Sequence, residues 1–180
     1  MSRIGKSPIA INPKVKVSYD SNTRLFSASG SLGSLNLTIH PAVCLEISDT
    51  EIKLLVKNPE NKKQRSIWGT TRSLIFNLIQ GVDKGYQKQL ELNGVGYKME
   101  IKGDKLKLNL GFSHPVDLDI PKNVSLKVEK NILTGTSIDK QALGDFLINK
   151  IFSIRPCEVY KHKGFKVVGR YYQKKVVNKK

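Results

Sequence analysis

The sequence contains an internal repeat, in which one pattern of apolar residues occurs in both halves of the chain. At a shift of 73 residues the first half of the chain falls on the second, for example Phe26 on Met99 and Val43 on Val116. Further segments match in the same order at shifts of 72 and 69 residues. A single alternating strand matches another by chance, but six consecutive matching segments indicate an internal duplication. We therefore predict two similar small domains.

Each copy is typical of strands followed by a helix. Leu106, Leu108 and Leu110 alternate with polar residues, which predicts a strand with one buried and one wet face. Residues at helical spacing follow in the second copy, namely Leu143, Phe146, Leu147, Ile151 and Ile154. Asp139 is a predicted N-cap, and Arg155-Pro156 a predicted stop. The fold class is therefore α+β, with a small antiparallel sheet and one helix in each domain.

In the first copy, Ile67, Leu74 and Leu78 form the corresponding helical stripe, which we expect to end at Gly81. These patterns predict a first domain over residues 1–82 and a second over residues 83–155, with almost no linker. A basic carboxyl-terminal extension over residues 156–180 completes the chain.

Positive charge is concentrated in this last part of the chain. The formal net charge is +16, and residues 155–180 hold +8 of it, with nine Lys or Arg residues against the single acid Glu158. Tyrosines and glycines lie among the cations, as in the run from Tyr160 to Lys166. Cations attract phosphates, rings stack on bases, and glycine allows close backbone approach, so the composition indicates nucleic-acid binding.

No catalytic motif is complete in this sequence. Gly94-Val95-Gly96 begins like a dinucleotide fingerprint, but Met99 stands where the third glycine is required. Gly5-Lys6-Ser7 resembles the end of a phosphate-binding loop whose first glycine would precede residue 1. Asp117 and Asp119 are explained as wet positions of an alternating strand. We predict no active site.

Nothing in the sequence predicts a metal or a cofactor either. The three histidines, at positions 40, 114 and 162, lack a second ligand at a suitable spacing. Cys44 and Cys157 stand far apart, and we interpret both as ordinary residues. We expect no small-molecule substrate.

Two rival functions use the same basic segment. A membrane-surface module would need an amphipathic basic helix, but two glycines and the Val167-Val168 pair interrupt residues 160–175. No stretch approaches the about 18 apolar residues that cross a bilayer, so we expect no membrane partner. An enzyme acting on nucleic acid would need a carboxylate cluster or a metal site.

Several blocks together resemble the bacterial-type family of ribosomal protein L-six of the large subunit. The blocks are residues 1–9 (MSRIGKSPI), 68–75 (WGTTRSLI), 92–98 (LNGVGYK), 110–116 (LGFSHPV) and 160–164 (YKHKG). They keep the family's order and cover nearly the whole chain. The resemblance implies two duplicated domains and a structural, non-catalytic role in the ribosome of a bacterium or of an organelle that encodes its own ribosomal proteins.

The resemblance also implies the partners. Members of the family bind large-subunit ribosomal RNA near the sarcin-ricin loop and the stalk base, where translation factors dock and where other large-subunit proteins are neighbours. The family's RNA-binding signature falls on Tyr160, Lys161, Lys163 and Gly164. This chain departs from the family at His162, where a small residue is usual, and at Phe165, where an aliphatic residue is usual.

From the residues and the resemblance together we expect a defined set of RNA contacts. The predicted rRNA-binding residues are Arg155, Tyr160, Lys161, His162, Lys163, Gly164, Lys166, Arg170, Lys174 and Lys175. Secondary candidates are Gly94, Gly96, Lys98 and His114. Two roles stay open for Tyr160, stacking on RNA and covering the end of the domain core. Tight strand connections are the alternative role for the loop glycines.

Overall fold

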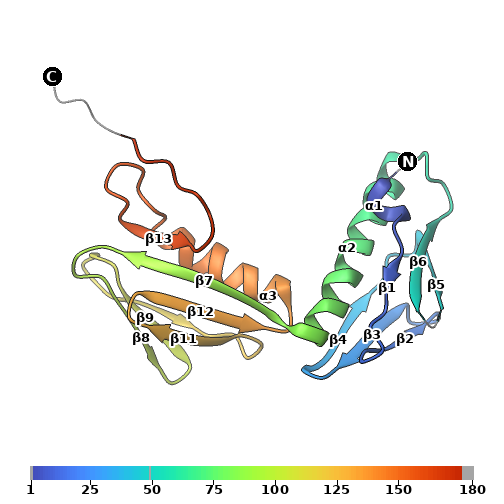
Figure 1. Ribbon diagram of the computed structural model, residues 1–180, viewed down its shortest axis with the longest axis horizontal. Helices are drawn as coiled ribbons and strands as arrows, with labels where there is room; N and C mark the ends of the chain where they lie inside the picture. Colours follow the sequence, from blue (N-terminus) through green and yellow to red (C-terminus); the bar gives the residue numbers. More distant parts are fainter. Residues whose placement is uncertain (1, 49, 176–180) are drawn as a thin grey trace. The chain divides into compact units, whose positions relative to one another are not determined.

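The chain separates into two compact units. The computed structural model describes residues 2–48 and 50–175. Unit one spans Met1–Gly85 and unit two Tyr86–Lys180 (Figure 1). Each unit contains two antiparallel sheets with a helix packed on them. The predicted α+β class is confirmed, but the prediction of a single sheet in each domain was wrong.

Unit one consists of two three-stranded antiparallel sheets and a long helix. Its elements are α1 (Arg3–Lys6), β1 (Ile9–Ala10), β2 (Lys16–Asp20), β3 (Leu25–Gly30), β4 (Gly33–Thr38), β5 (Val43–Ile47), β6 (Glu51–Val56) and α2 (Lys62–Lys84). The strand orders are β2-β3-β4 and β1-β6-β5.

The helix α2 buries a stripe that shares only Leu78 with the predicted one. Its buried side chains are Trp68, Thr71, Ile75, Leu78, Ile79 and Val82. Ile67 and Leu74, which the sequence assigned to the core face, are only half-buried. The helix also continues past Gly81 to Lys84, and Gly85 N–H donates to the Gly81 carbonyl oxygen at 2.9 Å. Apolar residues surround α2 on more than one side, so only the position of the sheets decides which face is buried.

Two sequence blocks that lie far apart in the chain form one packing site in unit one. Gly5 of α1 lies directly against the indole of Trp68, where a Cβ atom would come within 2.5 Å of the ring. Trp68 Nε1 donates to the Leu54 carbonyl oxygen at 3.0 Å. Arg72 donates to the carbonyl oxygens of Ser7 and Pro8, both at 3.3 Å. The amino-terminal block is therefore held on α2 by packing and hydrogen bonds.

Unit two has a three-stranded sheet, a four-stranded sheet and one continuous helical segment. Its elements are β7 (Tyr86–Asn93), β8 (Lys98–Lys102), β9 (Lys105–Asn109), β10 (Val116–Asp119), β11 (Ser125–Glu129), β12 (Ile132–Ser137), α3 (Lys140–Gly144), the π-helix η1 (Asp145–Phe152) and β13 (Gly164–Val167). The strand orders are β10-β9-β8 and β11-β12-β7-β13.

The helical segment of unit two follows the prediction. Asp139 Oδ1 accepts from the Gln141 amide at 2.8 Å, which confirms the predicted N-cap. Leu143, Phe146, Leu147 and Ile151 are all buried, as the apolar stripe indicates, whereas Ile154 at the end of the predicted stripe is only half-buried. The core of this unit lies between that stripe and the sheets.

The two units repeat one topology, although not in the register of the 73-residue shift. That shift placed β3 on β8, yet β3 is the central strand of its sheet and its counterpart is the central strand β9. A shift of 81 residues instead sets Ile52 on Leu133 and Val43 on Val124, all four buried. The first register was wrong by one strand because short alternating strands at regular spacing match their neighbours nearly as well as their true counterparts.

Candidate nucleic-acid interface

A strand in the middle of the basic segment, β13, belongs to the core of unit two. The strand β13 pairs antiparallel with β7, with Gly164 opposite Asn93 and Lys166 opposite Glu91. Phe165 is 0% exposed and lies in the main hydrophobic cluster of the unit. We predicted a basic extension that begins at residue 156. Within that range, however, the alternating residues Phe165 and Val167 bury their side chains in the core of unit two. Residues 176–180 of the predicted extension lie outside the described residues.

Before β13 the chain makes a tight turn, which we call the basic turn (residues 158–163). Glu158 N–H donates to the Lys163 carbonyl oxygen at 2.8 Å, and His162 N–H donates to the Glu158 carbonyl oxygen at 3.0 Å. These bonds leave the side chains of Lys161 and Lys163 exposed. Tyr160 is 49% exposed and is not part of the core cluster. The turn therefore presents two cations and a ring to solvent.

His162 is the unusual member of the basic turn. Its φ angle is 55°, a left-handed conformation that non-glycine residues adopt infrequently. Its Nε2 atom is buried and has no hydrogen-bond partner within the described parts of the chain. The imidazole is thus turned partly inward.

Gly164 is required by the path of the chain inside the protein. Its φ angle is 111°, and a Cβ atom there would come within 2.7 Å of the Arg155 carbonyl oxygen. Directly after it, Phe165 N–H donates to that same oxygen at 2.9 Å. The close approach that the structure shows at this glycine is between two segments of the protein, and close approach of RNA to it stays a prediction.

Two glycine-containing loops lie at the same end of unit two as the basic turn. Gly164 pairs with Asn93, the last residue of β7. Because the two strands are antiparallel, Lys163 precedes β13 at the same end of the sheet at which Gly94 follows β7. Lys98 is the first residue of β8 and pairs with Asn109, the last residue of β9. The β7–β8 loop (94–97) therefore lies beside the β9–β10 loop (110–115). We call these two loops and the basic turn the end surface. Three of the four secondary candidates, Gly94, Gly96 and His114, belong to it, Lys98 begins β8 directly beside it, and all four are exposed.

Arg155 joins the two loops through their aromatic residues. Its Cζ atom lies 5.3 Å from the ring centroid of Tyr97 and 5.3 Å from that of Phe112. Both distances are those of cation–π contacts. Sequence reasoning assigned Arg155 to phosphate and overlooked the two rings, although an aromatic residue in each glycine-containing loop was a signal available in the sequence.

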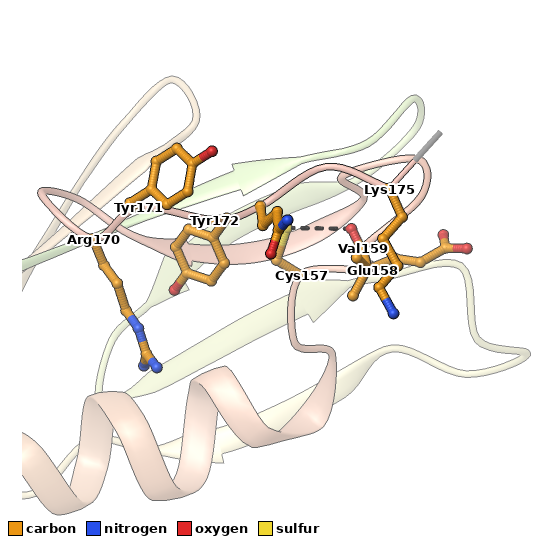
Figure 2. A pocket seen from close by; sticks show the side chains of 8 residues that line it. Cys157, Glu158, Val159, Arg170, Tyr171, Tyr172 and Lys175 are labelled. Atoms are coloured by element: carbon orange, nitrogen blue, oxygen red, sulfur yellow. Dashed lines mark hydrogen bonds between the residues drawn. The ribbon is translucent and has the colours of Figure 1, made fainter. Parts of the chain in front are cut away.

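The chain after β13 folds back on the segment before it. The Tyr172 hydroxyl accepts from Val167 N–H at 3.0 Å, and Lys175 N–H donates to the Val159 carbonyl oxygen at 3.2 Å. A hollow of about 310 Å³ lies between the two segments. Figure 2 shows the side chains that line it. Its lining is Cys157, Glu158, Val159, Arg170, Tyr171, Tyr172, Gln173 and Lys175. Arg170, Lys174 and Lys175 are exposed, and the Tyr171 side chain is 87% exposed.

Two acidic residues, Glu158 and Glu91, lie near this region, and neither forms an ion pair with its cations within the described residues. Within residues 2–48 and 50–175, the ion pairs involve Lys53, Lys102 and Lys105, and none includes a cation of residues 155–175. Burial raises the pKa of the Cys157 thiol, and the negative charges of Glu158 and Glu91 act in the same direction, against the positive charge on Lys166. Cations that outnumber their acidic neighbours produce a field that attracts polyanions.

Other site types find no support in the described residues. No group of three His, Cys, Asp or Glu side chains there is arranged to hold a metal ion. His40 instead accepts from the Ala42 amide through Nδ1, at 3.1 Å. A search of the described helices found none that is both long and apolar enough to cross a bilayer.

The family model described as "Ribosomal protein L6" matches residues 12–85 and again residues 93–167. The chain belongs to the ribosomal protein L6 family. The two L6 matches begin 81 residues apart, the same shift that aligns the strands of the two units. The duplication is thereby confirmed, and β13 lies within the second L6 repeat.

Relatives named "Large ribosomal subunit protein uL6" match nearly the whole chain. The protein of Desulfosudis oleivorans is 43% identical over 175 residues, covering 97% of each chain. That of Pelobacter propionicus is 46% identical over 167 residues, covering 92% of this chain and 91% of its own. That of Magnetococcus marinus is 40% identical over 181 residues and covers both chains fully.

Membership of the L6 family sets the general role. The chain is a structural component of the large ribosomal subunit, associates with ribosomal RNA and other ribosomal proteins, and is not an enzyme. The resemblance seen in the sequence blocks is confirmed by matches that span nearly the full length.

Proposed function

We propose that unit two binds large-subunit ribosomal RNA near the sarcin-ricin loop and the stalk base, through the end surface and the basic segment 155–175. In this position it supports the region where translation factors dock and contacts neighbouring proteins of the stalk base. The observation that carries the proposal is the exposure of Lys161 and Lys163 on a hydrogen-bonded turn, without an acidic partner in the described residues.

The physical basis is phosphate neutralisation on a preformed shape. Helical RNA hides its base edges in a deep, narrow groove, so proteins recognise it mainly through phosphates, 2′-hydroxyls and overall shape. The basic turn is rigidified by its two backbone bonds, and β13 anchors it to the sheet. Little conformational entropy is then lost when the two lysines meet phosphates. Exposed rings such as Tyr160 and Tyr171 are suited to stacking on unpaired bases.

Salt dependence of rRNA binding tests the electrostatic part of the proposal. With about six phosphates engaged, log affinity falls against log salt with a slope of about −4 to −5. Lys161→Gln and Lys163→Gln each make the slope shallower by about one unit. Lys127→Gln is the matched control. Lys127 is an exposed lysine on β11, and β11 and β13 form the two opposite edges of the same sheet. A nearly flat salt response of the unsubstituted protein would contradict the proposal.

Footprinting tests the location. The full chain is bound to a large-subunit rRNA fragment that contains the sarcin-ricin loop and the stalk-base helices. We expect protection in both elements, lost in the Lys161→Gln/Lys163→Gln double variant. Point substitutions are preferred to deletion of residues 156–180, because deletion would remove Phe165 from the core. Equal binding to anionic vesicles and to this rRNA would favour a membrane-surface role instead.

A further inference from the structure

We propose that Arg155 is a positioning residue: its guanidinium fixes the end surface in the shape that rRNA recognises. The role differs from that of Lys161 and Lys163, whose charges face solvent. It rests on the proposed rRNA-binding function and names the residue that preorganises the site.

The side chain of Arg155 links two loops. Tyr97 comes from the β7–β8 loop and Phe112 from the β9–β10 loop, and the guanidinium lies 5.3 Å from each ring centroid. The Tyr97 ring also packs on both loops, because Cβ atoms at Gly94 and Gly111 would lie within 2.4 and 3.2 Å of it. Arg155 and Tyr97 together therefore hold the two loops side by side.

The backbone of Arg155 links the third part of the end surface. Its carbonyl oxygen accepts from Phe165 N–H at 2.9 Å, at the point where the basic turn enters β13. Gly164 leaves room for this oxygen. One residue thus contacts the β7–β8 loop, the β9–β10 loop and the end of the basic turn.

A planar guanidinium is needed for this role. Arginine stacks on aromatic faces through its plane, whereas the lysine ammonium is a compact, strongly hydrated point charge. Arg155 is also half-buried, unlike Lys161 and Lys163. We call the contact of the Arg155 guanidinium with the rings of Tyr97 and Phe112 the bracket. Loops that are ordered before binding lose less entropy when RNA binds. The bracket therefore contributes to affinity although its guanidinium does not neutralise a phosphate.

The test compares Arg155→Lys with Arg155→Gln in the full chain. If Arg155 positions the loops, both variants bind the rRNA fragment about tenfold more weakly, and both keep the salt slope of the unsubstituted protein. Phe112→Leu, which removes one ring of the bracket, weakens binding about threefold. Adding Phe112→Leu to Arg155→Lys costs less than the two separate effects combined, because both act through one contact. Lys127→Gln changes neither affinity nor slope.

A second readout needs no RNA. Hydrogen exchange at the amides of Tyr97 and Phe112 is faster in Arg155→Lys than in the unsubstituted protein, while exchange along β12 is unchanged. If hydrogen exchange in both loops is the same in Arg155→Lys as in the unsubstituted protein, Arg155 does not hold the loops in place and the proposal is wrong.

The outcomes separate the two proposals. Normal affinity of Arg155→Lys, together with a slope about one unit shallower in Arg155→Gln, overturns the positioning role and identifies a phosphate ligand. Failure of the unsubstituted protein to bind the fragment overturns the proposed function itself.

Discussion

Gly164 lies so close to Pro156 that a Cβ atom on the glycine would come within 2.5 Å of the Pro156 carbonyl oxygen. The same region carries the parallel bridge between Pro156 and Phe165. A glycine in a sequence block that resembles an RNA-binding signature is therefore explained by the packing of the protein itself. Its replacement should affect folding before it affects RNA binding.

Gly164→Ala should lower the free energy of unfolding of unit two by about 2 kcal/mol or more, because both the positive φ angle and the carbonyl contact oppose a methyl group. Amide exchange in β7 and β13 measures the effect. Gly169→Ala is the matched control: its φ angle of 85° is also positive, but no atom lies within 4 Å, so about 1 kcal/mol is expected. Equal losses in the two variants would show that the Pro156 contact is not important.

Gly5→Ala should destabilise unit one, because a methyl group would meet the Trp68 ring at 2.5 Å and separate α1 from α2. The expected loss is about 1 to 3 kcal/mol. Trp68 is the single tryptophan of the chain, so its fluorescence during urea unfolding reports on this unit. Gly69→Ala serves as the control. That position has ordinary contact distances and lies within α2, where alanine is favoured by about 0.5 to 1 kcal/mol, so stability should not fall.

Ile75→Ala and Leu74→Ala distinguish the observed stripe of α2 from the predicted one. Ile75 is fully buried, so its truncation should cost about 2 to 5 kcal/mol. Leu74 is half-buried, and its truncation should cost clearly less, about 1 kcal/mol. Unfolding followed by Trp68 fluorescence measures both. A larger loss of unfolding free energy in Leu74→Ala than in Ile75→Ala would support the buried face predicted from sequence instead of the observed one.

The two cysteines should react with iodoacetamide at different rates near pH 8. Burial raises the pKa of Cys157, which lowers its thiolate fraction at a given pH, and the side chain is also partly covered. Cys44 is exposed. The thiolate is the reactive form, so Cys44 should be alkylated first, and the rate at Cys157 should rise as the pH rises through its elevated pKa. Peptide mass mapping at several pH values measures both rates. Faster labelling of Cys157 would contradict its placement.

Local patterns determined much of this fold. The helical segment of unit two was predicted correctly because Asp139 supplies a cap and Leu143, Leu147 and Ile151 recur on one face. Alternation at Leu106 and Leu108 likewise predicted the strand β9 and its buried side. Such patterns work because side-chain periodicity is a property of the element itself.

The sequence by itself determined that the chain is duplicated, that its elements are strands followed by a helix, and that the last part is strongly basic. Only the tertiary structure decided which strands correspond, that Phe165 completes a core, and that the Arg155 guanidinium lies between Tyr97 and Phe112. The reason is physical. Alternation specifies the two faces of a strand but not its partner, and the sign of a charge specifies what attracts it but not which neighbour the fold places beside it.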